Sequence, residues 1–235
     1  MRSTSVRALA RAGEPVALGA GLTRVPLLGA AAINCFLVAA PDGSLTLVDS
    51  GLRRSLARIE AALAAFGGDL RRIVLTHAHG DHVGAAPELA RRSGATVYAH
   101  ALDVPHLLAG YAPPIDPRMP IARLSTPRTR RLPERFARVE PLQDGDRLEG
   151  GLTVVHLPGH TRGQIGLLHA GARALLLADA LFNLRGLGFG PRLFCEDIAL
   201  GRRSVRRIAE LDFDVAAFGH GPELRDRAAL LRFVS

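Results

Sequence analysis

The sequence predicts an α/β protein in which two β-sheets pack against each other with helices on their outer faces. Strand-like and helix-like stretches alternate in two blocks, which lie before and after a proline- and arginine-rich segment at residues 110–138. A chain of 235 residues is long enough for one sizeable domain, and no linker divides it. We therefore predict a single domain over residues 14–235, preceded by a flexible N-terminal tail at residues 1–13.

The first block begins with antiparallel strands. Asp42-Gly43 lies between two apolar runs, which is a strong signal for a β-hairpin turn. Apolar residues then recur at near-helical spacing after Gly51, and Gly67-Gly68 ends that helix. The predicted elements of this block are strands at 14–25, 32–40, 45–51, 72–75 and 95–99, and helices at 52–66, 84–93 and 101–109.

The second block returns to strands after residue 138. Asp144-Gly145-Asp146 and Gly150-Gly151 are turn signals, and Ala170-Gly171 lies at the centre of a second hairpin. The predicted elements of this block are strands at 152–157, 164–169, 173–178 and 215–218, and helices at 197–211 and 223–233.

Residues 110–138, between the two blocks, carry six prolines and seven arginines and show no regular periodicity. Loops of this length without secondary structure of their own are usually functional or disordered. We expect this segment to form a lid or wall over the functional site, with a plain solvated insertion as the alternative.

The composition argues against several classes of protein. No run of about 18 apolar residues offers a membrane span, and residues 1–13 lack the apolar core of a signal peptide. We therefore expect a cytoplasmic protein without a membrane partner. The net charge is +8, but the chain has no lysine and its 30 arginines are spread along it, which indicates coding bias rather than a nucleic-acid surface. Cys35 and Cys195 are expected to be reduced thiols.

The stretch from Leu75 to Gly84 concentrates three histidines and one aspartate directly after a predicted strand. In an extended loop, residues two apart point to the same side, so His77 and His79 can bind one ion. Asp81 and His82 then face a neighbouring position. The spacing therefore predicts a site for two metal ions at the carboxyl end of a strand, where ligand sites in α/β sheets gather.

Three more ligand-type residues stand at the ends of predicted strands. His160 follows Pro158-Gly159, Asp179 follows an apolar run, and His220 follows Gly219. Imidazole and carboxylate suit zinc, and also iron or manganese. A bridging carboxylate can hold two ions about 3.5 to 4 Å apart around a shared water. The remaining histidines are expected to be ordinary strand, helix or turn residues: His100, His106, His156 and His169.

The order of these motifs resembles the metallo-β-lactamase-fold hydrolases, and most closely their glyoxalase II-like branch. The motifs that carry the resemblance are Thr76-His77-Ala78-His79-Gly80-Asp81-His82-Val83-Gly84, Pro158-Gly159-His160-Thr161-Arg162-Gly163, Ala178-Asp179-Ala180-Leu181-Phe182 and Gly219-His220-Gly221. The resemblance implies an αβ/βα four-layer sandwich with a binuclear centre at the edge between the sheets.

The resemblance also implies a role for each ligand. Metal one would be held by three histidines, metal two by an aspartate and two histidines, and one further aspartate would bridge them. The residues implied for metal one are His77, His79 and His160, and those for metal two are Asp81, His82 and His220. The implied bridging residue is Asp179. We expect two divalent ions, with zinc first and iron or manganese as alternatives. A metal-bridging hydroxide would cleave an ester, thioester or lactone of a small molecule, with Asp81 as the catalytic residue that orients the water and passes its proton onward.

Departures from the family patterns restrict the substrate. Asp179 stands where the commonest zinc β-lactamases carry a cysteine, which argues against antibiotic hydrolysis. Phe182 replaces the tyrosine of similar lactonases and is expected in the core. Only 15 residues follow His220, where glyoxalase II has a glutathione-binding helical region, so we do not expect a glutathione thioester. The expected substrate-lining residues are Asn183, Arg185 and Arg192, with surface loop positions as the alternative.

Two other activities remain open. A persulfide dioxygenase resembles the same family but uses one iron, whereas the complete second ligand set here favours two ions. An RNA-processing nuclease would fit the positive charge, although no separate RNA-binding region is visible and nucleic acid is not the expected partner. The oligomeric state is not indicated by the sequence.

Overall fold

The structure is a computed structural model, and it describes residues 13–235. Its first sheet holds seven strands in the order β1-β2-β3-β4-β5-β6-β7. The first four strands are antiparallel neighbours, and the next three add in parallel to β4. These strands are β1 (Val16–Gly19), β2 (Leu22–Leu28), β3 (Ile33–Ala39), β4 (Ser44–Val48), β5 (Asp69–Leu75), β6 (Thr96–His100) and β7 (Glu140–Leu142).

The second sheet holds five strands in the order β12-β11-β10-β9-β8. All its pairs are antiparallel except β11 and β12, which run parallel. The strands are β8 (Arg147–Leu148), β9 (Leu152–His156), β10 (Ile165–His169), β11 (Ala174–Leu176) and β12 (Val215–Ala217). The two sheets therefore come from successive parts of the chain.

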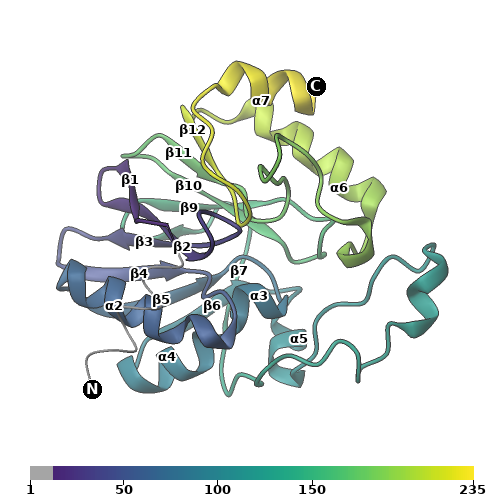
Figure 1. Ribbon diagram of the computed structural model, residues 1–235, viewed down its shortest axis with the longest axis horizontal. Helices are drawn as coiled ribbons and strands as arrows, with labels where there is room; N and C mark the ends of the chain where they lie inside the picture. Colours follow the sequence, from purple (N-terminus) through teal and green to yellow (C-terminus); the bar gives the residue numbers. More distant parts are fainter. Residues whose placement is uncertain (1–12) are drawn as a thin grey trace.

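Helices cover the outer face of each sheet. Figure 1 shows α2 and α4 beside the first sheet, and α6 and α7 on the opposite side of the molecule. The α-helices are α2 (Leu56–Phe66), α3 (Gly80–Val83), α4 (Ala86–Ser93), α5 (Val104–Ala109), α6 (Ile198–Ser204) and α7 (Arg227–Val234); the 3₁₀ helices are η1 (Arg53–Ser55), η2 (Pro120–Leu124), η3 (Arg192–Phe194) and η4 (Val205–Glu210). The layers run helix, sheet, sheet, helix, which confirms the predicted four-layer sandwich.

Three apolar clusters fill the spaces between these layers. Along β3, Cys35 and Leu37 belong to the cluster beneath α2 and α4, whereas Phe36 and Val38 belong to the cluster between the sheets. This alternation follows from the two-residue period of a strand. The third cluster packs β11 residues such as Leu175 against η4 and α7. Both sheets are therefore fixed in place on both faces.

Hydrogen bonds set helix boundaries that differ from the predicted ones. The predicted helix at 197–211 is α6 followed by η4, and at their junction the Ser204 hydroxyl donates to the carbonyl of Pro158 at 2.7 Å. The last helix begins at Arg227 because the Asp226 carboxylate accepts the amide of Ala229 at 2.9 Å as an N-cap. The helix predicted at 84–93 is preceded by a separate turn, α3.

The segment 110–138 follows an irregular path that contains η2. It is the teal trace that extends from α5 in Figure 1. Asp116 ties it to the second half of the chain, because its amide donates to the Cys195 carbonyl at 2.6 Å and its carboxylate accepts the Ile198 amide at 3.4 Å. Arg118 adds ion pairs to Asp116 at 2.6 Å and to Asp197 at 2.8 Å.

Two predictions concern features outside this core. The tail predicted at 1–13 lies, apart from Gly13, outside the described residues. Within residues 13–235, no helix combines the length and apolar character needed to cross a bilayer.

Candidate metal centre

The loop after β5 brings four of the predicted ligands to one edge of the sandwich. β5 ends at Leu75, so that His77 and His79 lie in the following loop, while Asp81 and His82 lie on the single turn of α3. His77 and His82 are fully buried. The first half of the chain thus supplies its ligands from one continuous stretch.

The second sheet supplies the other three predicted ligands. His160 follows β9, Asp179 follows β11 and His220 follows β12, and all three side chains are largely buried. These strand ends face the loop after β5, so the seven residues meet where the two sheets adjoin.

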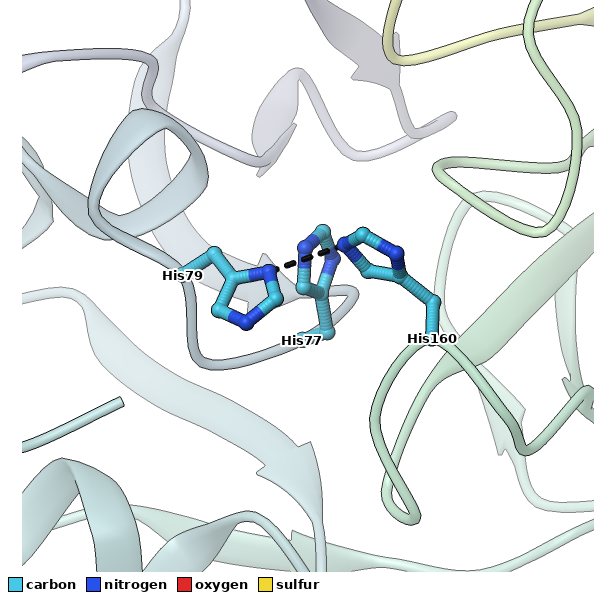
Figure 2. A group of neighbouring side chains, drawn as sticks. All are labelled: His77, His79 and His160. Atoms are coloured by element: carbon cyan, nitrogen blue, oxygen red, sulfur yellow. Dashed lines mark hydrogen bonds between the residues drawn. The ribbon is translucent and has the colours of Figure 1, made fainter. Parts of the chain in front are cut away.

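Three histidines form the first group of the cluster. Nitrogen atoms of His77, His79 and His160 lie within 4.8 Å of one another, and Figure 2 shows the three rings turned toward a common point. His79 Nδ1 is 2.9 Å from His160 Nε2. Three converging imidazoles are a donor set that zinc and related ions accept.

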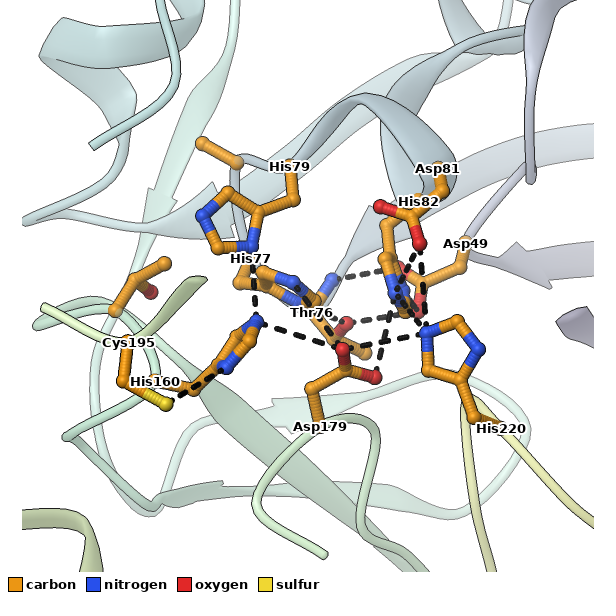
Figure 3. A network of polar contacts seen from close by, with 12 residues as sticks. Asp49, Thr76, His77, His79, Asp81, His82, His160, Asp179, Cys195 and His220 are labelled. Atoms are coloured by element: carbon orange, nitrogen blue, oxygen red, sulfur yellow. Dashed lines mark hydrogen bonds and ion pairs between the residues drawn. The ribbon is translucent and has the colours of Figure 1, made fainter. Parts of the chain in front are cut away.

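The second group consists of Asp81, His82 and His220. His220 Nε2 is 3.4 Å from Asp81 Oδ2 and 3.4 Å from His82 Nε2. Asp179 lies between the two groups: its Oδ2 is 3.4 Å from His160 Nε2 and 3.3 Å from His220 Nε2, and its Oδ1 is 3.3 Å from His82 Nε2 (Figure 3). The structure therefore brings all seven predicted ligands together, with Asp179 in the shared position.

A buried carboxylate that the sequence reasoning missed fixes the orientation of His82. Asp49 follows β4, and its Oδ2 is 2.8 Å from His82 Nδ1. It also accepts the amide and the hydroxyl of Thr76 at 2.8 and 2.7 Å. Asp49 has a φ of 59°, a backbone region in which aspartate is tolerated better than most residues. Such partners set which ring nitrogen faces a metal. The signal in the sequence is an aspartate at a strand end, but its partner depends on the β4–β5 pairing.

His77 Nδ1 has a local partner, the Thr76 hydroxyl at 3.2 Å, whereas the partners of His220 and His160 are tertiary contacts. His220 Nδ1 is 2.6 Å from the carbonyl of Ala32. His160 Nδ1 is 3.6 Å from Cys195 Sγ, whose thiol is also 3.7 Å from the Pro191 carbonyl. With Nδ1 of each ring occupied, Nε2 is left to face the cluster.

Asp103 is a second buried carboxylate without a role in the sequence-based assignment. Its Oδ2 accepts the amide of Ala78 at 2.8 Å and the hydroxyl of Thr161 at 2.9 Å, and its Oδ1 accepts the amide of Gly163 at 3.1 Å. It therefore links the loop that carries His77 to the loop after β9. Burial raises its pKa to about 6 despite these hydrogen bonds.

The electrostatics divide the histidines into two kinds. Burial, followed by the repulsion of His160, lowers the pKa of His79 to about 3, and burial lowers the pKa of His160 to about 4. Neutral imidazole is the form that binds metals. Burial also opposes the charged form of His220, but hydrogen bonding and charge from Asp179 outweigh it and raise its pKa to about 9. The carboxylates thus favour positive charge at the second group.

The residues present fit a pair of divalent cations. Within residues 13–235, His77 Nε2 is a buried polar atom without a hydrogen-bond partner, and the buried Asp179 Oδ1 has an ion-pair contact with His82 Nε2 at 3.3 Å. Such atoms are costly unless something satisfies them. Both point into the cluster, where a cation would complete their bonding (Figure 3). The donor set, imidazole and carboxylate without a thiolate, suits zinc, iron or manganese.

A cavity of about 600 Å³ opens in front of the cluster. Its floor includes His79, Asp81, His160, Asp179 and His220. Residues of the segment 110–138 and of the loop after Asp179 form its walls. That segment therefore forms a wall of the cavity, while its predicted movement as a lid stays a prediction.

The predicted substrate-lining residues lie outside this cavity. Asn183 donates its side-chain amide to the carbonyl of Pro222 at 2.9 Å, and Arg185 is exposed on the surface. Arg192 lines a smaller neighbouring cavity together with His160 and Asp179. Of the three side chains, that of Arg192 thus lines a cavity beside the cluster, whereas Asn183 adjoins the cluster through its backbone amide, which donates to the carbonyl of His220 at 2.9 Å.

Phe182 has a different place from the predicted one in the core. It lines the large cavity, and its ring stacks on His220 with the centroids 4.7 Å apart and the planes 1° from parallel. The contact is invisible in the sequence because it depends on where β12 delivers His220. Phe182 therefore covers one face of the His220 ring and limits the access of water to that ring.

The family follows from comparison with known proteins. A family model described as the metallo-beta-lactamase superfamily matches residues 28–220, a range that includes all seven residues of the cluster. The chain belongs to the metallo-beta-lactamase superfamily. Its four layers and the position of its cluster agree with that membership.

Relatives within the superfamily have several names. The chain is 29% identical over 212 residues to the probable metallo-hydrolase YflN of Bacillus subtilis, covering 80% of each protein. It is 32% identical to a hydroxyacylglutathione hydrolase of Acidiphilium cryptum over 83% of this chain and 65% of that protein. It is also 32% identical to the uncharacterized protein YobT of B. subtilis, over 66% of this chain and 64% of YobT. It therefore spans slightly less than two thirds of the last two relatives.

Solved structures of similar fold superimpose along most of the chain. A structure of TTHA1623 in a di-iron-bound form has a TM-score of 0.64 and 27% identity, covering 88% of this chain and 95% of that one. The Rm3 metallo-beta-lactamase has a TM-score of 0.67 and 26% identity, covering 92% and 81%. The superfamily binds divalent metals, and one of these neighbours holds two irons.

Proposed function

We propose that this protein is a binuclear metal-dependent hydrolase that cleaves an ester, thioester or lactone of a small molecule. The observation that carries the proposal is the position of Asp179 between two complete ligand groups at the floor of a cavity. The hydroxyacylglutathione hydrolases and the probable metallo-hydrolase among the relatives support hydrolysis, and the di-iron structure supports two ions. Zinc remains our first expectation, with iron or manganese as alternatives.

Each ligand group has a defined task in this proposal. His77, His79 and His160 would hold one ion, and Asp81, His82 and His220 the other, with Asp179 shared. Bound divalent ions would polarise the carbonyl and lower the pKa of a water to about 7. Water would add across the acyl C–O or C–S bond, giving a carboxylate, an alcohol or thiol, and a proton.

In this proposal Asp81 would handle that proton. Its side chain is 38% exposed, which makes it far more accessible than Asp179, and it lines the cavity floor. Burial opposes its ionisation, but His82 and His220 outweigh this and hold its pKa well below the ordinary value. The carboxylate is therefore ionised, so it could accept a hydrogen bond from a water, orient it and pass its proton onward rather than keep it.

Replacing His77 or Asp179 by alanine should abolish hydrolysis and reduce the bound metal, because each removes a donor from the cluster. The measurement is metal content by mass spectrometry together with turnover of a panel of esters, thioesters, lactones, β-lactams and phosphodiesters. His106→Ala is a matched control, because His106 lies on α5 outside the cluster and should keep both properties.

Two outcomes would contradict the proposal. Full activity in a metal-depleted His77→Ala or Asp179→Ala protein would remove the role of the cluster. One iron per chain with oxygen consumption, and no hydrolysis anywhere in the panel, would indicate a mononuclear oxygenase instead.

A further inference from the structure

The cavity above the metal cluster is apolar on its walls. Beyond the ligands its lining includes Leu52, Ile115, Leu132, Phe182, Leu184 and Phe194. These side chains come from three separate parts of the chain: the loop before α2, the segment 110–138 and the loop after Asp179. Apolar character is therefore a property of the whole wall rather than of one element.

Two of these wall residues are unusually exposed for their size. Leu184 is 52% exposed and Phe194 is 54% exposed. Leaving large apolar side chains in water loses the free energy that their burial would provide. Contiguous exposed apolar surface of this kind marks ligand-binding grooves or interfaces. Here the surface borders the reactive centre, so a bound substrate would cover it.

Few polar groups on the walls could bind a polar substrate. Beyond the ligands, the charged and hydroxyl-bearing side chains of the lining are Thr129, Arg130 and Arg131. The Arg130 guanidinium already donates to the carbonyl of Ala112. A substrate rich in amides and charges would leave much of its polar surface against apolar walls, which is unfavourable unless each group finds a partner.

We infer that the substrate carries an apolar aliphatic group of about six to ten carbons next to the scissile carbonyl, a size consistent with a cavity of this kind. The inference rests on the proposed hydrolase function. The floor of the cavity would hold the carbonyl, and the apolar wall that includes Leu132 and Phe194 would enclose the aliphatic group. The volume of about 600 Å³ leaves room for both parts.

The first test is a chain-length series on metal-loaded protein. One series is p-nitrophenyl acetate, butyrate, hexanoate and octanoate, and a second is alkyl thioacetates with a growing alkyl chain. Each buried methylene should raise kcat/KM about three- to fourfold in at least one series. Values that stay flat with chain length in both series would overturn the inference.

Matched variants locate the effect in this cavity. Phe194→Asp should flatten the chain-length dependence, because it places a charge on the wall. Leu193→Asp is the control: Leu193 is 40% exposed and adjacent in sequence, but it does not line the cavity. Leu184→Asp repeats the test from another part of the wall. An equal dependence of kcat/KM on chain length in the wild type and all three variants would overturn the assignment of the aliphatic group to this cavity.

A binding measurement separates this inference from the proposed function. Calorimetric titration of metal-loaded protein with acetate, butyrate, hexanoate and octanoate reports affinity without turnover. Affinity that rises with chain length, without hydrolysis of any ester, would support the apolar site and contradict the hydrolase. Equal affinities, with hydrolysis of short esters and no chain-length dependence in either kinetic series, would contradict the apolar site and leave the hydrolase standing.

Discussion

Gly219 is required by the crowding of the metal cluster. A Cβ at this position would lie 2.5 Å from Asp179 Oδ1 and 2.8 Å from His82 Cε1, closer than real side chains approach. Gly219→Ala should therefore displace both ligands and weaken metal binding by about 10- to 100-fold, the size typical of disturbed ligand positioning. Metal content after dialysis against buffered free metal measures the loss.

A second glycine provides the control for this prediction. A Cβ at Gly188 would meet nothing within 4 Å, so Gly188→Ala should bind metal like the wild type. Circular dichroism should show that both variants are folded. A Gly219→Ala protein that holds both ions with unchanged affinity would show that the cluster can move aside.

The seven residues that meet in the cluster could be predicted from the sequence, whereas the partners of their side chains could not. His77 to His82 form a local motif, and His160, Asp179 and His220 each follow an apolar strand, so residue type and position were enough. Asp49 and Cys195 also lie at loop positions, but only the folded chain brings them to Nδ1 of His82 and His160. Many aspartates occupy similar sites without a histidine partner.

At the scale of elements, one buried carboxylate ties the segment 110–138 to the second half of the chain. Asp116 is 2% exposed and joins this segment to the start of α6. Asp116→Ala should loosen the cavity wall, because Arg118 and the Ile198 amide lose their acceptor. We expect faster hydrogen exchange in residues 112–133 and a KM raised several-fold, with a smaller change in kcat.

The control for the wall is Arg123→Ala. Arg123 is exposed, and its side chain makes no hydrogen bond or ion pair within residues 13–235. Its replacement should leave exchange and KM unchanged. Unaltered exchange in the Asp116→Ala protein would mean that the wall is held by its backbone contacts alone.

His100, at the end of β6, stacks on His156, at the end of β9, and so joins the two sheets. Burial, followed by the charge of His156, lowers the pKa of His100 to about 4 from its ordinary value of 6.5. The unfolded chain therefore binds more protons between these values, and stability is lost as the pH falls from 6.5 toward 4. His100→Asn removes this contribution.

The measurement is urea unfolding of chelator-treated wild type and His100→Asn across this pH range. At neutral pH the variant should be less stable because it loses the stacked contact. The difference should shrink as the pH falls, since only the wild type has this histidine to protonate. Titration of the metal-ligand histidines is common to both proteins and cancels. A difference that stays constant would contradict the lowered pKa.

Helices and strands can be predicted from the sequence where the apolar periodicity is strong. They cannot be predicted where tertiary contacts determine the path of the chain. The hairpin at Asp42-Gly43 and the helix ending at Gly67 are encoded locally. The path of residues 110–138 is not, because it depends on Asp116 reaching the distant Cys195 carbonyl. The position of Phe182 beside the cavity cannot be predicted locally for the same reason, since its partner His220 follows another strand.

For the whole molecule, bound metal should act as a link between the two sheets. One sheet supplies His77 and His82 and the other supplies His160 and His220, so ions that bind only the folded chain stabilise it. Metal at about 100 times its dissociation constant contributes about 2.7 kcal/mol, which corresponds to an unfolding midpoint about 5–10 °C higher than in excess chelator. Scanning calorimetry at several free metal concentrations measures the shift.

The same experiment on His77→Ala tests the origin of the shift. That variant should unfold at nearly the same temperature with metal or chelator, because its first ligand group is incomplete. A wild-type midpoint that does not respond to metal would show that the ions contribute nothing to the joining of the sheets.

The position of β12 gives the metal centre an order of assembly. β12 pairs in parallel with β11 at the edge of the second sheet, and such pairings between distant segments form late. The first group has all three of its histidines once β9 is in place. The second group is incomplete until β12 has paired, because His220 follows β12. In the proposed binuclear arrangement, a chain that has not closed this edge would hold one ion but not two. The number of ions per chain would therefore record how far the sandwich has closed, and metal loading would act as a check on finished folding.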